Sequence, residues 1–166
     1  MIIKISVAVA AALLFLGLHP VNASNSQPVF NATTFAVVVN PANSYSGTPA
    51  EVRKLVKQLY LKSRRDWPGK GGTQAKALAR AKGTDEQAAL LSEILKMSAT
   101  ELEKHWIAVK QKTGQTRPNV VKSDTMLIKF VKKYDGALCI VKESVAKKAG
   151  KNVRVLMTFE VGTDPK

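Results

Sequence analysis

The sequence predicts an α/β fold, in which one compact domain holds a mostly parallel or mixed sheet flanked by about four helices. Apolar, β-branched runs that are typical of strands alternate along the chain with amphipathic runs that are typical of helices. Most of the expected helices also begin with a recognisable capping sequence. The length of 166 residues is what one domain of this class requires.

The first 23 residues read as a secretory signal. Lys4 precedes a short apolar run, and a small-residue cleavage motif ends at Ala23. The run is short for a membrane span, which leaves an uncleaved anchor as the alternative. We expect residues 24–34 to form a flexible mature N-terminus and residues 35–166 to form the domain. The predicted location is the periplasm, with no integral membrane segment after cleavage.

The first expected strand is the run "TFAVVVNP", which an Asn-Pro pair ends. Because this run is continuously apolar, we expect it to be buried on both faces in a parallel sheet. After the loop "ANSYSG", a helix starts at Thr48, since Thr48 and Glu51 form a capping box with Pro49 at the first helical position. Beyond a Trp-Pro-Gly turn, "AKALAR" is the second expected strand.

Three further helix starts are predicted at Thr84, Ser98 and Ser123. The stretch "KTGQTRPNV" before the last of them is expected to be an open loop. The third strand is "ALCIV", followed by one or two helical turns in "ESVAKKAG" and by the last strand, "NVRVLMTFEV". Apolar residues at helical spacing form the inner faces of the middle two helices: Leu90, Leu91, Ile94 and Leu95 in one, and Leu102, Trp106 and Val109 in the other.

The chain is strongly basic, with a formal net charge of +14 that becomes +13 when the signal and its one lysine are removed. In an exported protein this charge indicates anionic partners, such as small anions, acidic envelope polymers or anionic lipid. Nucleic acid is not expected, because export separates the chain from it. The alternative is that the lysines only keep the surface soluble.

Catalysis is not predicted. His19 leaves with the signal, so that His105 is the one histidine of the mature chain, too few for a two-histidine metal site. Cys139 is the one cysteine, which excludes an intrachain disulfide and a thiolate cluster. Since it lies in an apolar run, we expect a buried and inert thiol. No cofactor is expected.

The stretch "LARAKGTDEQAALLSEIL" carries the candidate binding site. A strand ends, a tight turn follows, and the free N–H groups of a new helix face outward beside two cations. These are the parts with which proteins hold an oxyanion. The expected anion-binding residues are Arg80, Lys82, Gly83 and Thr84, with Ser44 and Ser46 as donors from the first strand-to-helix loop. The alternative is an ordinary capped helix start, because Asp85 and Glu86 complement the same helix dipole.

Several pieces of the chain resemble one known family. They are "FAVVVNPANSYSG", "PAEVRKLVKQLYLKSRRDWPGK", "ARAKGTDEQAALLSEILKMSATELEKHW", "TGQTRPNVVKSD" and "YDGALCIV", and they cover roughly Phe35 to Leu156 in the family's order. The chain is similar to the phosphate-binding component of phosphate ABC importers, in the type II periplasmic-binding-protein superfamily. The resemblance implies an α/β binding fold without catalysis, phosphate as the ligand, and a membrane importer or sensor as the partner.

In that family, an Arg-x-x-Gly-Ser-Gly-Thr run at a helix start holds phosphate. Arg80, Gly83 and Thr84 stand at its Arg, first Gly and Ser, whereas Asp85 and Glu86 replace its second Gly and its Thr. The chain is also shorter than a two-lobed binding protein. We therefore expect either an exported, non-catalytic protein that binds phosphate or a related oxyanion, or a basic envelope interaction protein that keeps the fold but has lost small-ligand binding.

Overall fold

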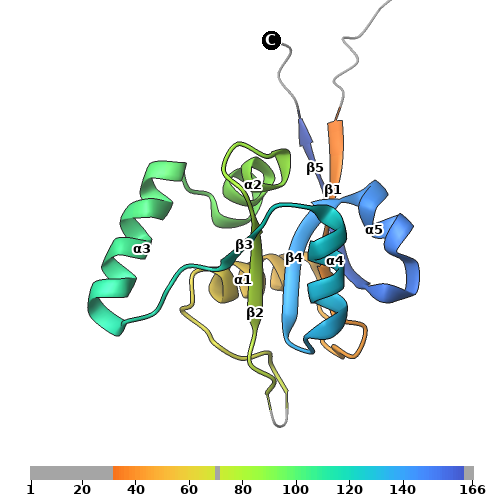
Figure 1. The fold of residues 1–166 in the computed structure, drawn as a ribbon, viewed down its shortest axis with the longest axis horizontal. Coiled ribbons are helices and arrows are strands. Elements are labelled where there is room, and N and C mark those ends of the chain that lie inside the picture. The colour runs from red at the N-terminus through yellow and green to blue at the C-terminus, as the bar shows by residue number, and fades with distance from the viewer. Residues whose placement is uncertain (1–31, 70–71, 163–166) are drawn as a thin grey trace, which may run out of the picture.

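The computed structural model describes residues 32–69 and 72–162, so the predicted signal and most of the predicted N-terminal segment lie outside the described residues. One five-stranded sheet has the strand order β3-β2-β4-β1-β5. Helices cover both of its faces (Figure 1). The elements are β1 (Ala32–Val39), α1 (Pro49–Tyr60), β2 (Lys76–Arg80), α2 (Asp85–Ala89), the π-helix η1 (Leu90–Leu95), α3 (Ala99–Thr113), β3 (Asn119–Val121), α4 (Asp124–Lys133), β4 (Ala137–Lys142), α5 (Glu143–Ala149), the 3-10 helix η2 (Gly150–Asn152) and β5 (Arg154–Gly162).

The fold is α/β as predicted, and the sheet is mixed. Strand β2 runs parallel to β3 and β4, whereas β1 runs antiparallel to β4 and β5. The expectation that the first strand is parallel was wrong. Its continuous apolar pattern follows from burial on both faces, and burial does not fix strand direction. The strand also starts at Ala32, inside the predicted N-terminal segment, and pairs there with Gly162 at the end of β5.

The predicted helix starts are confirmed. Thr48 and Ser98 make complete capping boxes, and the Thr84 and Ser123 side chains each accept a hydrogen bond from the first turn of their helix. Two features were not predicted. The helix that begins after Thr84 widens into a π-helix before it ends, and the short strand β3 lies in the stretch expected to be a loop.

The helices form two layers, one on each face of the sheet, and a separate hydrophobic core lies between each layer and the sheet. On one face of the sheet, α1 and η1 pack their apolar sides against β1, β4 and β5. On the other face, α4 and α5 pack mainly against β1 and β4. Cys139 lies in this second core and is fully buried, as the sequence predicted.

The Trp-Pro-Gly turn is fastened to the start of β4. The Trp67 ring is 4% exposed, and its Nε1 donates a hydrogen bond of 3.0 Å to the carbonyl oxygen of Gly136. The ring of Tyr45 packs beside it, with 5.9 Å between the ring centroids. Gly136 also lies against the backbone of Gln74, so that the turn, β2 and β4 meet at one crowded point.

We expect Gly136→Ala to lower the free energy of unfolding by about 1–3 kcal/mol, the usual cost of forcing an added methyl group into packed structure. A Cβ at this position would overlap the carbonyl oxygen of Gln74, and backbone cannot swing aside as a flexible side chain can. Gly162→Ala is the matched control, because a Cβ there meets nothing within 4 Å. Urea denaturation measures the free energy of unfolding of both variants. An equal decrease in the two would show that the crowding at Gly136 does not affect stability.

Candidate functional site

In open α/β sheets, ligands bind at the carboxyl ends of the parallel strands. Here the carboxyl ends of β2, β3 and β4 lie at one edge of the sheet, which we call the carboxyl edge. The helices α2, α4 and α5 begin close to it, each soon after one of these strands or its neighbour (Figure 1). The predicted cradle from Arg80 to Thr84 follows β2 and lies at this edge.

Two carboxylates of the protein enclose the Arg80 guanidinium. Its Nη2 lies 3.2 Å from Asp124 Oδ1, and its Nε lies 3.7 Å from Glu86 Oε2. Its Nη1 donates a hydrogen bond of 3.2 Å to the carbonyl oxygen of Val121. The side chain of Arg80 is 12% exposed and that of Glu86 only 6%. The guanidinium is therefore held inside the protein, where the two carboxylates neutralise its charge.

The start of α2 also satisfies its polar groups internally. Thr84 Oγ1 donates to the carbonyl oxygen of Ala81 at 2.9 Å and accepts from the backbone N–H of Gln87. The N–H of Gly83 donates to the side-chain Oε1 of Gln87 at 3.1 Å. The arrangement is that of a capped helix start, the alternative that the sequence analysis left open.

A second ion pair covers the same edge. Lys142 Nζ, at the end of β4, lies 2.6 Å from Asp85 Oδ2. The hydrogen bond to Asp85 raises the pKa of Lys142 above its ordinary value. Asp85 and Glu86 are thus both paired with cations of this protein.

The structure does not bring Ser44 and Ser46 to the cradle. They follow β1, which runs opposite to β2: Val39 at the end of β1 and Ala77 near the start of β2 are both paired with Leu138. The two serines therefore lie at the opposite edge of the sheet. Their expected place beside Arg80 depended on a parallel β1, whereas β1 is antiparallel to its neighbours.

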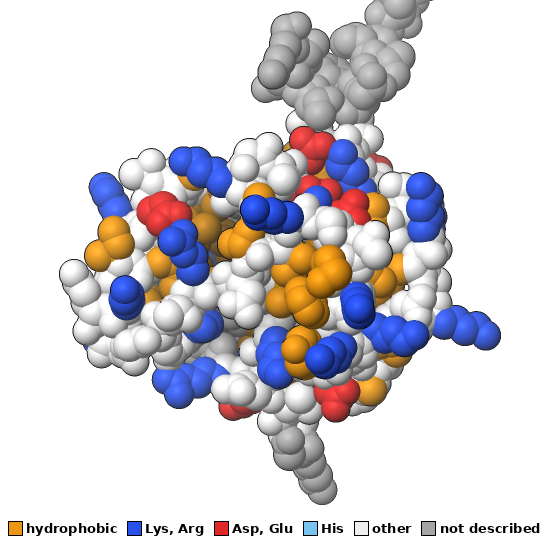
Figure 2. All heavy atoms as spheres, viewed as in Figure 1, with side chains coloured by type: hydrophobic (Ala, Val, Ile, Leu, Met, Phe, Trp, Pro, Cys, Tyr) orange, Lys and Arg blue, Asp and Glu red, His pale blue; other side chains and the backbone are white. Residues whose placement is uncertain are grey.

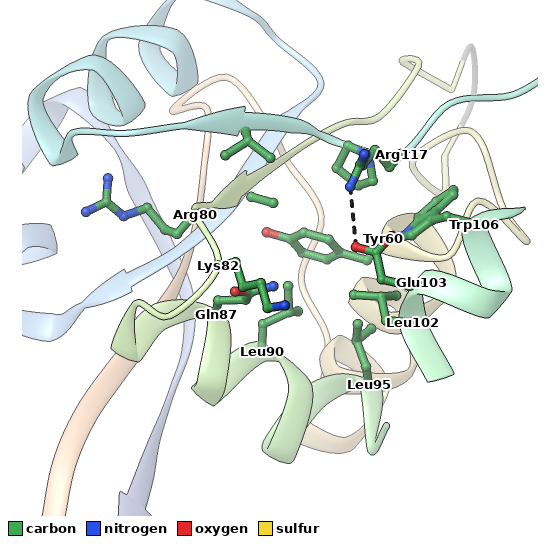
Figure 3. Close-up of a pocket in the computed structure, with 13 residues that line it drawn as sticks. Tyr60, Arg80, Lys82, Gln87, Leu90, Leu95, Leu102, Glu103, Trp106 and Arg117 are labelled. Carbon is green, nitrogen blue, oxygen red and sulfur yellow. Dashed lines mark hydrogen bonds and ion pairs between the residues drawn. The ribbon is translucent and has the colours of Figure 1, made fainter. Parts of the chain in front are cut away.

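Lys82 points away from the Arg80 ion pairs, into a hollow of about 190 Å³ (Figure 3). We call this the α3 hollow, because α3 forms one wall of it. The other walls come from η1, the end of β2, the end of α1 and the segment that leads into β3. Arg80 contributes to the rim, but its guanidinium is directed to the far side of β2 (Figure 3). The polar lining is made by Lys82, Gln87, Glu103 and Arg117, and the apolar lining by Tyr60, Ala79, Leu90, Leu95, Leu102, Trp106, Pro118 and Val120.

The polar groups of the α3 hollow lie at its mouth. Glu103 and Arg117 form an ion pair with 3.3 Å between Oε1 and Nη1. Tyr60 faces the interior, but its hydroxyl donates to the carbonyl oxygen of Leu78 at 2.7 Å, and burial raises its pKa well above the ordinary value. The hollow was not predicted from the sequence. Leu102 and Trp106 were expected to be core residues, and the residues of a cavity wall have the same helical spacing as those of a core.

Cys139 and His105 both have structural roles in the fold. Burial raises the pKa of the Cys139 thiol far above its ordinary value, which suppresses the reactive thiolate. His105 Nε2 lies 3.1 Å from the carbonyl oxygen of Leu61 and ties α3 to the end of α1. Within residues 32–69 and 72–162, no group of three His, Cys, Asp or Glu side chains is placed to hold a metal ion.

None of the helices formed by the described residues is long and apolar enough to cross a membrane.

No protein-family model and no curated protein matches this chain. Solved structures do. An ABC-type phosphate transport receptor from Vibrio cholerae is 16% identical with a TM-score of 0.55, over 75% of this chain and 46% of that one. PstS from Borrelia burgdorferi is likewise 16% identical with a TM-score of 0.55, over 75% of this chain and 47% of that one.

These similarities show the fold, which is the periplasmic-binding-protein-like α/β fold that the sequence predicted. The chain spans about half the length of the two receptors.

Proposed function

We propose that this protein is an exported, non-catalytic binding module that recognises anionic groups of an envelope partner through its basic surface. The carrying observation is the enclosure of Arg80 by Glu86 and Asp124. A small oxyanion at the start of α2 would have to displace the Glu86 and Asp124 carboxylates from Arg80 or bind beside them. Repulsion between the negative charges opposes its binding. The net charge of +14 still favours an anionic partner.

The surface best suited to such a partner lies over α4 and the edge of β3. Figure 2 shows basic side chains around a hydrophobic group in this region. The Nζ atoms of Lys76 and Lys133 lie 4.1 Å and 5.4 Å from the ring centroid of Tyr134, whose ring lines a shallow hollow with Phe130 and Val120. We call the exposed lysines here the α4 patch: Lys76, Lys129, Lys132 and Lys133.

The charges of the α4 patch are available to a partner. None of its lysines is ion-paired with a residue in the described part of the chain. Exposed lysines attract an acidic partner over a Debye length, and the neighbouring aromatic surface adds contact area. The patch therefore joins attraction over a distance with a surface on which a bound partner can pack.

A second candidate is an oxyanion-binding protein that uses Arg80, Lys82, Gly83 and Thr84 and works with an importer or a sensor. Two observations favour it: the solved neighbours are phosphate receptors, and the Arg stands at the end of a strand just before a helix start. It requires that Arg80 leave its carboxylates when the anion arrives.

We expect the protein without its first 23 residues to be retained on immobilised poly-L-glutamate at about 0.1 M NaCl and released near 1 M, where the Debye length falls from about 10 Å to about 3 Å. Two triple variants locate the contact by removing equal charge from two helices. One replaces the lysines of α4 by Gln: Lys129, Lys132 and Lys133. The other does so on α3: Lys104, Lys110 and Lys112. The α4 variant should elute at clearly lower salt than the α3 variant; equal elution would show that only net charge acts.

Phosphate separates the two candidates. In the proposed function, sodium phosphate raises the melting temperature of the wild type no more than NaCl of equal ionic strength. A ligand that binds only the folded protein, at a concentration of about 100 times its dissociation constant, would raise the free energy of unfolding by about 2.7 kcal/mol. The variant Glu86→Gln with Asp124→Asn removes both carboxylates from beside Arg80 and serves as the comparison. A phosphate-specific rise in the wild type would support the oxyanion-binding candidate instead.

A further inference from the structure

We infer that the α3 hollow binds a small amphipathic anion, an organic carboxylate with a flat apolar body of one or two rings. This site is distinct from the α4 patch and does not rest on the proposed function. The inference is carried by the apolar lining of the hollow, by the unpaired cation at its mouth, and by the way in which α3 and η1 build it.

The lining of the α3 hollow suits a flat apolar body. The Tyr60 and Trp106 rings and the Leu90 side chain all contribute to it, although each of these residues is nearly buried. A ligand in the hollow would thus contact apolar side chains that are otherwise almost entirely covered by the protein. Its volume of about 190 Å³ is below the ~300–1,000 Å³ of sites for drug-sized molecules, which limits the ligand to a small one.

The mouth of the hollow selects for negative charge. Lys82 has no ion pair and no side-chain hydrogen bond with any described residue, while Arg117 is neutralised by Glu103. The side-chain oxygen of Gln87 accepts from Gly83, which turns the donating amide nitrogen away from that bond. Lys82 and Gln87 both line the hollow, together with the Tyr60 ring (Figure 3). One ammonium and one amide donor can therefore hold a carboxylate whose body enters the hollow.

The backbone around the hollow explains why it is not filled. Helix α3 stands apart from the sheet and reaches the rest of the domain through side chains such as Leu102 and Trp106 (Figure 1). On the other side, the chain widens into the π-helix η1, which ends at Lys96 with a φ of 52°. Single π-helical turns of this kind occur frequently at functional sites. The space between α3 and η1 thus follows from the positions of their backbones and not from one small side chain.

The test uses indole-3-acetate as the probe and a ¹⁵N–¹H NMR titration of the protein without its first 23 residues. We expect saturable shifts of the Trp106 indole N–H and of the backbone amides at Lys82 and Gln87. Lys82→Glu should weaken binding at least about tenfold, which is the loss of one hydrogen bond between charged groups. Lys110→Glu makes the same charge change on α3, at a residue that does not line the hollow, and should leave the affinity unchanged.

Tryptamine, which carries an ammonium on the same ring system, tests the charge preference and should not bind. Acetate, which lacks the rings, tests the apolar lining and should not produce the shifts. The inference is overturned if no saturable shift appears at the hollow, if tryptamine binds as well as indole-3-acetate, or if the Lys82 and Lys110 variants lose the same affinity. Both substitutions are at exposed positions, so neither should prevent folding.

Discussion

Replacing Arg80 by Ala is expected to lower the free energy of unfolding by about 3 kcal/mol, because the change leaves the Glu86 carboxylate buried without its cation. Asp124 loses its partner at 3.2 Å, and the carbonyl oxygen of Val121 loses a hydrogen bond. The Arg80 Nε and the Asp124 Oδ1 make no aligned hydrogen bond with described residues, so the interaction is mainly one of charge. Urea denaturation at neutral pH measures the loss.

The control for Arg80→Ala is the double variant with Glu86→Gln. Removing the buried charge together with its cation should recover a large part of the lost stability, since an uncompensated charge costs more than a missing pair. Asp124→Asn alone should cost less, because that side chain is 40% exposed. If Arg80→Ala folds as stably as the wild type, the guanidinium is not held by these carboxylates, and its release to bind an anion becomes easier.

The second large effect is expected for Trp67→Ala, which should lower the free energy of unfolding by about 3–5 kcal/mol. The ring is buried, packs beside Tyr45 and is hydrogen-bonded to Gly136, so its removal opens a cavity where the turn meets β4. Thermal denaturation followed by circular dichroism measures the fall in melting temperature.

Trp67→Phe separates packing from hydrogen bonding. It keeps a ring in the cavity but removes the Nε1 donor, and one such hydrogen bond contributes about 1 kcal/mol. The Gly136 carbonyl oxygen still accepts from the N–H of Lys76 at 2.9 Å, so it does not become unsatisfied. A loss with Phe as large as that with Ala would mean that the hydrogen bond, rather than the buried ring, holds the turn.

The parts of the fold that depend on neighbouring residues were predicted well from the sequence. The N-caps at Thr48, Thr84, Ser98 and Ser123 are all present, because a cap is formed within one helical turn. The burial of Cys139 followed from the apolar residues on both sides of it.

The parts of the fold that depend on distant residues were not predicted from the sequence. The direction of β1 is decided by its pairing with β4 and β5, which follow it by about a hundred residues. Strand β3 has three residues, of which two are exposed, too few for a periodic signal. The placement of Arg80 against Asp124 joins positions 44 residues apart, although Glu86 in the first turn of α2 already indicated a carboxylate beside it.

The pairing of Ala32 with Gly162 places the two ends of the described domain side by side at the carboxyl edge. Domains with adjacent ends tolerate circular permutation and insertion into a host loop. A short linker could therefore join these ends, and new termini could be opened in the loop after β1, with the core strands keeping their order in space. A permuted chain of this kind would leave both the α4 patch and the α3 hollow uncovered.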